Sequence, residues 1–194
     1  MKTSGRYLAA VVMMFIITGC ARERQMHALP ASAAPPQPAA DKAVVVFMQP
    51  SSQAGGVASS LFELRRDGDR FVGILRYQQK VAYVAEPGRT RFMVVSRGAE
   101  FMDAELEAGK TYYVLLSPQT AGTVWFSLRP IRGAEIGGME FRQWSSECTL
   151  VENTDASRRW AVGSSGSVQR KKAADLPKWE QGANRPALRK EDGR

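Results

Sequence analysis

Histidine and cysteine are scarce in this chain, and their scarcity excludes several kinds of site. The 194 residues include one His and two Cys. One His cannot supply a cluster of histidine metal ligands, and two Cys make neither a four-Cys zinc site nor a disulfide-rich scaffold. His27 precedes the expected folded domain, which therefore has no His for a Ser-His-Asp or Cys-His arrangement. No Walker loop or dinucleotide-binding glycine motif is present either. We expect no catalytic residue, no metal and no cofactor.

Long hydrophobic runs are also lacking, which argues against a membrane span. The apolar stretch at the start of the chain, residues 7–17, follows Lys2 and Arg6. As a helix it would extend about 16 Å, roughly half the hydrocarbon thickness of a bilayer. A short apolar run after basic residues is typical of a secretory signal peptide.

The end of this signal carries a motif that places the protein in the cell envelope. It resembles the lipobox of bacterial lipoproteins in four residues, Ile17, Thr18, Gly19 and Cys20. The usual box has Leu, and Ala or Ser, at the first two positions. The resemblance implies removal of residues 1–19 and lipidation of Cys20. Because Ala21 is not Asp, the family analogy favours the outer membrane, facing the periplasm. The alternative is a Cys that ends an ordinary cleavable signal by chance.

A segment rich in Pro and Ala follows the lipobox. Residues 28–40 contain six Ala, four Pro and no charged residue. This composition cannot form a packed core and favours a semi-rigid spacer of about 3.1 Å per residue. We therefore expect residues 20–40 to be a linker that lifts the domain off the membrane, with His27 solvated at its edge.

The next part of the chain has the apolar period of β-strands. Val, Phe, Tyr, Leu and Ile recur in runs separated by turn residues such as Asp-Gly and Pro-Gly. The expected strands are 43–49, 60–66, 70–75, 80–85, 89–96, 100–107, 110–117 and 123–131. Their spacing of roughly 8 to 12 residues predicts a mainly β fold, a single antiparallel β-sandwich of about seven or eight strands over residues 41–154.

One hairpin in this sandwich can be tested by its register. A three-residue loop of Arg97, Gly98 and Ala99, with Gly98 left-handed, places apolar pairs on one face and opposite charges on the other. The apolar pairs are Val94 with Met102, Phe92 with Ala104 and Thr90 with Leu106. The charged pairs are Arg91 with Glu105 and Arg89 with Glu107.

The C-terminal part of the chain reads as a partly helical extension over residues 155–194. We expect helices at 138–147, at 155–162 with Thr154 as the cap, and at 167–175, and a short strand at 148–151. The Pro of Leu176-Pro177 should end the third helix. We expect this segment to cover the face of strand 110–117 that carries Tyr112, Val114 and Leu116.

Positive charge is concentrated in that extension. Residues 155–194 hold 10 basic and 5 acidic side chains, whereas residues 41–154 hold 13 of each. Either this is an ordinary charged surface, or it contacts peptidoglycan carboxylates or lipid phosphates. The candidate contacts are Arg158, Arg159, Arg170, Lys171 and Lys172. We expect no nucleic acid partner, because the predicted location is periplasmic and aromatic residues do not alternate with the basic runs.

The remaining reactive side chains have ordinary explanations. Asp103, Glu105 and Glu107 alternate on one strand face, where neighbouring Arg residues should neutralise them rather than leave a calcium or acid/base site. The apolar neighbours of Cys148 predict a buried thiol. Glu135 with Glu140 is the kind of carboxylate pair that a glycosidase would need.

Residues 43–131 resemble a group of proteobacterial lipoproteins of unknown function with a small prealbumin-like or PEGA-like β-sandwich. The residues that carry the resemblance are 43–47 (AVVVF), 50–52 (PSS), 83–88 (YVAEPG) and 106–113 (LEAGKTYY). It implies the fold but no activity. We expect a non-catalytic lipoprotein module, anchored in the membrane by its lipid, that binds an envelope protein or peptidoglycan. The alternative is a carboxylate-dependent enzyme acting on envelope glycans.

Overall fold

The structure is a computed structural model, which describes residues 23–54, 56–119 and 124–194. Cys20 and the rest of the lipobox lie outside these residues. The strands are β1 (Met26–Ala28), β2 (Ala43–Gln49), β3 (Ser59–Leu64), β4 (Arg70–Leu75), β5 (Gln79–Ala85), β6 (Gly88–Val95), β7 (Ala99–Leu106), β8 (Thr111–Gln119), β9 (Trp125–Pro130), β10 (Thr149–Asn153) and β11 (Ala187–Leu188). The helices are α1 (Met139–Glu147), α2 (Asp155–Gly163) and α3 (Ser165–Gln181), with short 3-10 turns η1 (Ser52–Ala54) and η2 (Lys190–Asp192).

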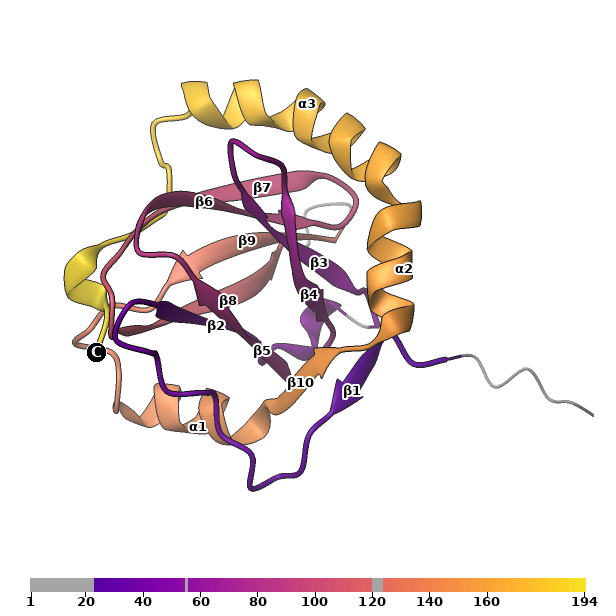
Figure 1. The fold of residues 1–194 in the computed structure, drawn as a ribbon. Helices are drawn as coiled ribbons and strands as arrows, with labels where there is room; N and C mark the ends of the chain where they lie inside the picture. Colours follow the sequence, from indigo (N-terminus) through magenta and orange to yellow (C-terminus); the bar gives the residue numbers. More distant parts are fainter. Residues whose placement is uncertain (1–22, 55, 120–123) are drawn as a thin grey trace, which may run out of the picture.

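Two sheets pack face to face in the centre of the molecule (Figure 1). The first has the order β1-β10-β5-β2-β8-β9, and the second has the order β11-β7-β6-β3-β4. Both are mixed, because β2 pairs with β8, β10 with β5 and β11 with β7 in parallel. The chain is thus mainly β, as predicted.

The central strand β2 contributes alternate side chains to two hydrophobic clusters, one on each face of its sheet. All seven of its residues are buried, as expected of a strand that is covered on both faces. Val45 and Phe47 face the core between the sheets, where the Phe47 ring meets Phe92 edge-on at 5.1 Å. Val44 and Val46 face the other way and pack in the cluster beneath α1.

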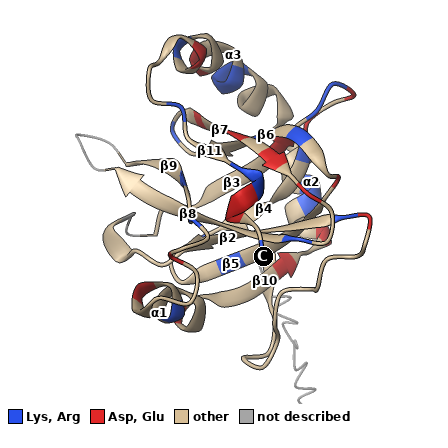
Figure 2. Cartoon of the chain, turned by 90° about the vertical axis from the view of Figure 1, so that its left-hand side faces the viewer, with Lys and Arg blue, Asp and Glu red and all other residues tan. Residues whose placement is uncertain are grey.

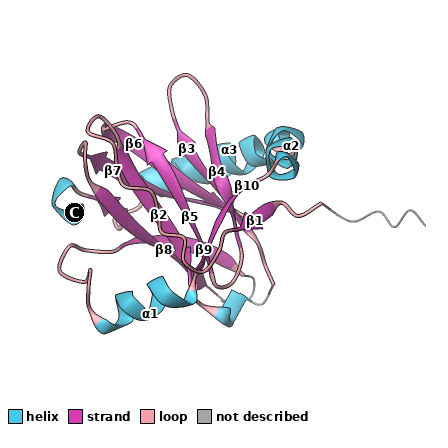
Figure 3. Ribbon diagram, turned by 60° about the horizontal axis from the view of Figure 1, so that its bottom comes forward, coloured by secondary structure: helices cyan, strands magenta, loops and turns pink. Residues whose placement is uncertain are grey.

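Helices cover the outer face of each sheet. On the first sheet, Phe141 of α1 contacts the Tyr113 ring at 4.9 Å. On the second sheet, Trp179 of α3 packs on Phe101, and Trp160 of α2 packs near Phe71. The molecule therefore has four layers, α1, two sheets, and the α2–α3 pair (Figures 1 and 3).

The expectation of a single antiparallel sandwich of seven or eight strands was wrong in its finer detail. The eight predicted strands are present within a few residues, and the short strands β1, β10 and β11 extend the sheets. The parallel β2–β8 pair forms because the chain between them crosses to the second sheet twice before it returns. Local alternation identifies a strand, but it does not identify its neighbour.

The hairpin of β6 and β7 has the predicted faces but a different register. Phe92 pairs with Met102 and Arg91 with Asp103, so each partner is two residues from the predicted one. The loop is residues 96–98, and Gly98 is outside the left-handed region. Because the shift is two residues, every side chain keeps its face. The charged face remains paired, with Arg91 at 2.6 Å from Asp103.

The helices are confirmed in position, but their packing partner differs. Thr154 caps α2, its hydroxyl accepting from the Ser157 N–H at 3.3 Å. The helix α3 continues through Pro177, which was expected to end it. It covers the second sheet and not strand 110–117, whose Tyr112 faces the core between the sheets while Tyr113 packs against α1.

A short part of the segment expected to be a spacer joins the sheet. Residues Met26–Ala28 form β1, which pairs with β10, and the Leu29 N–H donates to the Leu150 carbonyl at 2.9 Å. Met26 also packs against the core. The folded body therefore begins about five residues after Cys20. His27 is exposed within β1.

Candidate functional site

The five basic residues that were predicted as surface contacts have different surroundings. Arg158, Arg159 and Arg170 are exposed on α2 and α3. The Arg159 guanidinium pairs with Glu23, just before β1. The exposed arginines thus lie on the outer helical layer, and Arg159 lies at the point where the N-terminal segment joins the fold.

The other two basic residues turn toward the second sheet. The Lys171 ammonium donates to the Ser96 carbonyl, and the Lys172 ammonium contacts both Asp69 oxygens at 2.7 and 2.8 Å. The Asp69 side chain is only 8% exposed. Lys172 therefore attaches α3 to the sheet, which is a structural role.

The alternating carboxylates on β7 and just after it are neutralised. The pairs are Asp103 with Arg91 at 2.6 Å, Glu105 with Arg89 at 3.7 Å, and Glu107 with Lys110. The hydrogen bond from Lys110 lowers the pKa of Glu107. In Figure 2, basic residues (blue) and acidic residues (red) lie near one another around β3, β6 and β7. Among the described residues, no group of three His, Cys, Asp or Glu side chains could hold a metal ion.

Glu135 does not have the environment of a general acid. Burial acts to raise its pKa, but the Arg132 N–H and the Arg129 guanidinium, at 2.8 and 2.7 Å, bring the pKa below its ordinary value. A general acid needs a raised pKa to hold its proton at neutral pH. Glu140, by contrast, is an exposed residue in the first turn of α1.

The feature best suited to bind a ligand is a hollow of about 470 Å³ between the second sheet and the bend where α2 meets α3. Five serines line it, Ser59, Ser60, Ser96, Ser164 and Ser167. Three basic residues also line it, Arg76, Arg97 and Lys171. Of the described residues, no Asp or Glu is part of this lining. We call this hollow the serine-arginine groove.

The groove has a polar floor beside an apolar wall. The Ser60 hydroxyl donates to the Val95 carbonyl at 3.2 Å, and the Ser59 hydroxyl donates to the Gln49 side-chain oxygen at 3.2 Å. The Gln49 amide nitrogen is buried and has no hydrogen-bond partner among the described residues. Trp160 and Val57 contribute apolar surface. An apolar hollow with a few convergent polar groups is the usual form of a small-molecule site.

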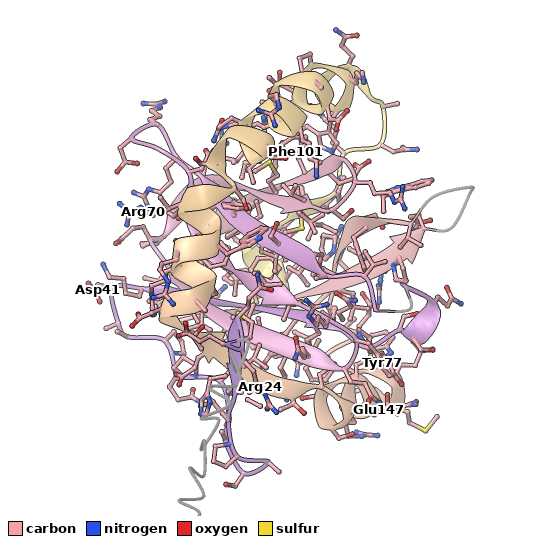
Figure 4. The ribbon with its side chains drawn as sticks, turned by 90° about the vertical axis from the view of Figure 1, so that its right-hand side faces the viewer. Arg24, Asp41, Arg70, Tyr77, Phe101 and Glu147 are labelled. Atoms are coloured by element: carbon pink, nitrogen blue, oxygen red, sulfur yellow. The ribbon has the colours of Figure 1, made fainter. Side chains whose placement is uncertain are left out.

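A second hollow, of about 620 Å³, adjoins the groove on the side of the N-terminal segment. The two share Gln25, Ile74 and Arg76. Arg24 lines the second hollow and lies at the start of α2, where the Thr154 hydroxyl donates to the Arg24 carbonyl at 2.9 Å (Figure 4). The groove therefore opens close to the start of the folded body.

A third hollow, of about 500 Å³, holds two acids and two tryptophans. Burial, and then the charge of Asp175, raise the pKa of Glu100. Asp175 itself accepts from the Ala99 N–H at 3.0 Å and lies 3.3 Å from Lys178. Trp125 and Trp179 also line this tryptophan pocket. One of its two acids thus already stabilises the β6–β7 hairpin.

Sequence reasoning found Lys171 but missed Arg76, Arg97 and the serines of the groove. These residues come from β3, the ends of β4 and β6, and the helical layer. No local motif joins them. The sequence signal that indicated part of this groove was the excess of basic over acidic residues in segment 155–194, which contains Lys171.

Comparisons with known proteins add little. No family model and no curated protein sequence matches this chain. Among solved structures, part of the chain matches the NMR structure of a protein from Eubacterium rectale, with 11% identity and a TM-score of 0.31 over 46% of this chain and 88% of that one. This likeness is too distant to transfer a function. Separately, no helix in the described part of the chain is long and apolar enough to cross a bilayer.

Proposed function

We propose that this protein is a lipid-anchored lipoprotein of the bacterial envelope that binds a ligand without catalysing a reaction. Its anchor is the lipid on Cys20, in the outer membrane and facing the periplasm. The lipobox of residues 17–20 supports the anchor, and the resemblance of residues 43–131 to proteobacterial lipoproteins supports the same assignment.

The observation that carries the binding function is the serine-arginine groove. Three cations and five hydroxyls converge there next to apolar surface, with no acid among its described lining residues. Such a lining favours an anionic ligand, because uncompensated cations raise the local concentration of anions. Candidate sources are lipid phosphates, peptidoglycan carboxylates or an acidic surface of another envelope protein.

Fractionation of cells tests the anchor. The wild-type protein should sediment with outer membranes, and the Cys20→Ala protein should appear in the soluble periplasmic fraction, because it has no acyl chains. Retention of Cys20→Ala protein in the membrane fraction would contradict the lipid anchor.

Site-specific crosslinking in intact cells tests the binding function. A photoreactive amino acid is placed at Ser167, which is exposed and lines the groove, and in a separate protein at Met139, which is 82% exposed on α1, on the opposite helical layer. We expect a defined adduct from position 167 and none from position 139. Identical products from both positions would show that capture is non-specific and that the groove is not the site.

A carboxylate-dependent activity on envelope glycans is the second candidate. The observation that favours it is the Glu100–Asp175 pair in the tryptophan pocket, since a raised pKa suits a general acid. Incubation with purified peptidoglycan separates the two functions. The non-catalytic proposal predicts no released fragments. Release by the wild type that Glu100→Gln abolishes would favour the enzyme.

A further inference from the structure

We propose that the serine-arginine groove binds the phosphate headgroup of an anionic phospholipid in the membrane that holds the lipid anchor. This inference rests on the proposed function and names the ligand class of the same site.

The charge and hydrogen-bonding groups of the groove fit a phosphate. Arg76 and Arg97 provide planar guanidinium groups, which bind phosphate oxygens in pairs. Lys171 adds a third cation.

The Ser59 and Ser60 hydroxyls of the groove already donate within the protein. The hydroxyls that suit a phosphate are therefore those of Ser164 and Ser167 on the helical side. Arg97 and Ser167 are exposed, so a headgroup entering the groove would meet a cation and a hydroxyl at the rim.

The apolar wall distinguishes a lipid phosphate from a free one. Trp160, Val57 and Ile74 lie in the same lining as the cations. Inorganic phosphate would leave this surface in contact with water, whereas the glycerol and upper acyl carbons of a phospholipid would cover it. Burial of apolar surface favours binding roughly in proportion to the area removed from water.

The length of the tether places the groove near the headgroups. Gln25 lines the groove and is five residues from Cys20 in the sequence. At most about 3.6 Å per residue, this chain reaches about 18 Å from the lipidated residue. A peptide this short keeps the neighbouring face of the domain against the membrane surface. Anionic lipids also attract basic side chains over about a Debye length, 8 to 10 Å.

The outer face of α2, the helix whose Trp160 lines the groove, also carries exposed apolar surface. On α2, Val162 is 77% exposed and lies one turn from Arg158. Tyr77, which follows Arg76 in the β4–β5 turn, is 43% exposed. Apolar and aromatic side chains between arginines are typical of surfaces that rest on a bilayer.

Vesicle cosedimentation of the unacylated Cys20→Ala protein tests the proposal without the anchor. The vesicles are phosphatidylcholine alone, or phosphatidylcholine with 30% phosphatidylglycerol as the probe. We expect binding to the anionic vesicles only. In that background, Arg97→Gln and Arg76→Gln together should weaken binding by about tenfold or more, because each basic side chain near an anionic surface contributes to affinity.

Arg66→Gln and Arg170→Gln together are the matched control, because they remove the same two charges from exposed residues that do not line the groove. This pair should leave vesicle binding unchanged. An equal loss in the control pair would show diffuse attraction and overturn the groove as the site. The Arg76 guanidinium donates to the Gly56 carbonyl at 3.0 Å, so the loss of this hydrogen bond could disturb the fold of Arg76→Gln. If it does, Arg97→Gln alone tests the groove, with Arg170→Gln alone as its control.

Competition identifies the source of the phosphate. Soluble dihexanoyl phosphatidylglycerol should displace the protein from vesicles at a lower concentration than inorganic phosphate. Equal potency of the two would overturn the lipid assignment, because the apolar wall would then contribute nothing. Binding of a soluble muramyl peptide, measured directly by calorimetry, together with no vesicle binding would overturn the lipid class while leaving a ligand-binding module in place. Absence of any position-167 adduct in cells would instead contradict the proposed function itself.

Discussion

Cys148 lies beneath α1 with its thiol shielded from solvent. It is 3% exposed and packs with Val46 and Leu115. Burial raises its pKa to about 11, although the nearby Lys80 ammonium acts in the opposite direction. In the unfolded chain the thiol should titrate near its ordinary value, about 8.5 to 9. Between these two values the unfolded state binds fewer protons than the native state, so stability falls as pH rises.

The contribution of this thiol can be measured by urea denaturation at pH 8 and pH 10.5. The wild type should lose about 2 kcal/mol more of its unfolding free energy between these pH values than Cys148→Ala does. Other groups that titrate in this range are common to both proteins and cancel in the comparison. Parallel losses in the two proteins would show that the thiol is not protected in the native state.

At the scale of the element, α3 shows how tertiary contacts sustain a helix that its sequence opposes. Pro177 removes a backbone donor and disfavours the helix interior. The helix continues because Leu176 and Trp179 on either side of it pack on the second sheet. The Arg91 guanidinium also covers the Trp179 ring at 4.7 Å. Lys172 adds the ion pair with Asp69.

Replacing Lys172 with Met tests how much that ion pair holds α3 in place. The substitution keeps the aliphatic stem but leaves the Asp69 carboxylate nearly buried without its cation, which should lower the unfolding free energy by about 1–3 kcal/mol. Lys178→Met is the control, because that side chain is 77% exposed, and it should change stability by less than about 0.5 kcal/mol. Equal effects of the two substitutions in chemical denaturation would contradict the structural role of Lys172.

At the scale of the whole molecule, segments from both ends of the described chain complete the edges of the sheets. At one edge β1 pairs with β10, and at another β11 pairs with β7 in parallel. Near β11, the Arg132 guanidinium contacts the almost buried Asp192 carboxylate at 2.6 Å. The central sandwich therefore depends on residues outside the predicted 41–154 domain for its edges.

Shortening the N-terminal segment tests this dependence. A protein that starts at residue 30 loses β1 and the Met26 side chain, which packs over Gly73 in β4. Its unfolding free energy should fall by about 1–3 kcal/mol, because an edge strand and buried apolar surface are lost. A protein that starts at residue 23 keeps both and should match the Cys20→Ala protein in thermal melts. Equal melting temperatures for all three would show that β1 is dispensable.

The sequence predicted the features that depend on residues close together in the chain, and it did not predict those that depend on residues far apart. The strand β2, the Thr154 cap and the burial of Cys148 were all predicted, because each depends on side chains within a few residues. The faces of the β6–β7 hairpin were also predicted, while its register was not. When the three-residue loop moves back by one position, each residue of β6 pairs with a residue of β7 two positions away from the predicted one. All side chains then stay on the same face, so alternation alone cannot distinguish the two registers.

By itself, the sequence determined the strands, the helix positions and the polarity of each face. Local period and capping express these features directly. Only the tertiary structure decided the parallel pairings, the layer that covers each sheet and the serine-arginine groove. Gln25, Arg76, Arg97 and Lys171 become neighbours in that groove from distant parts of the chain. Their convergence depends on how two sheets and two helices pack, and no short stretch of sequence carries that information.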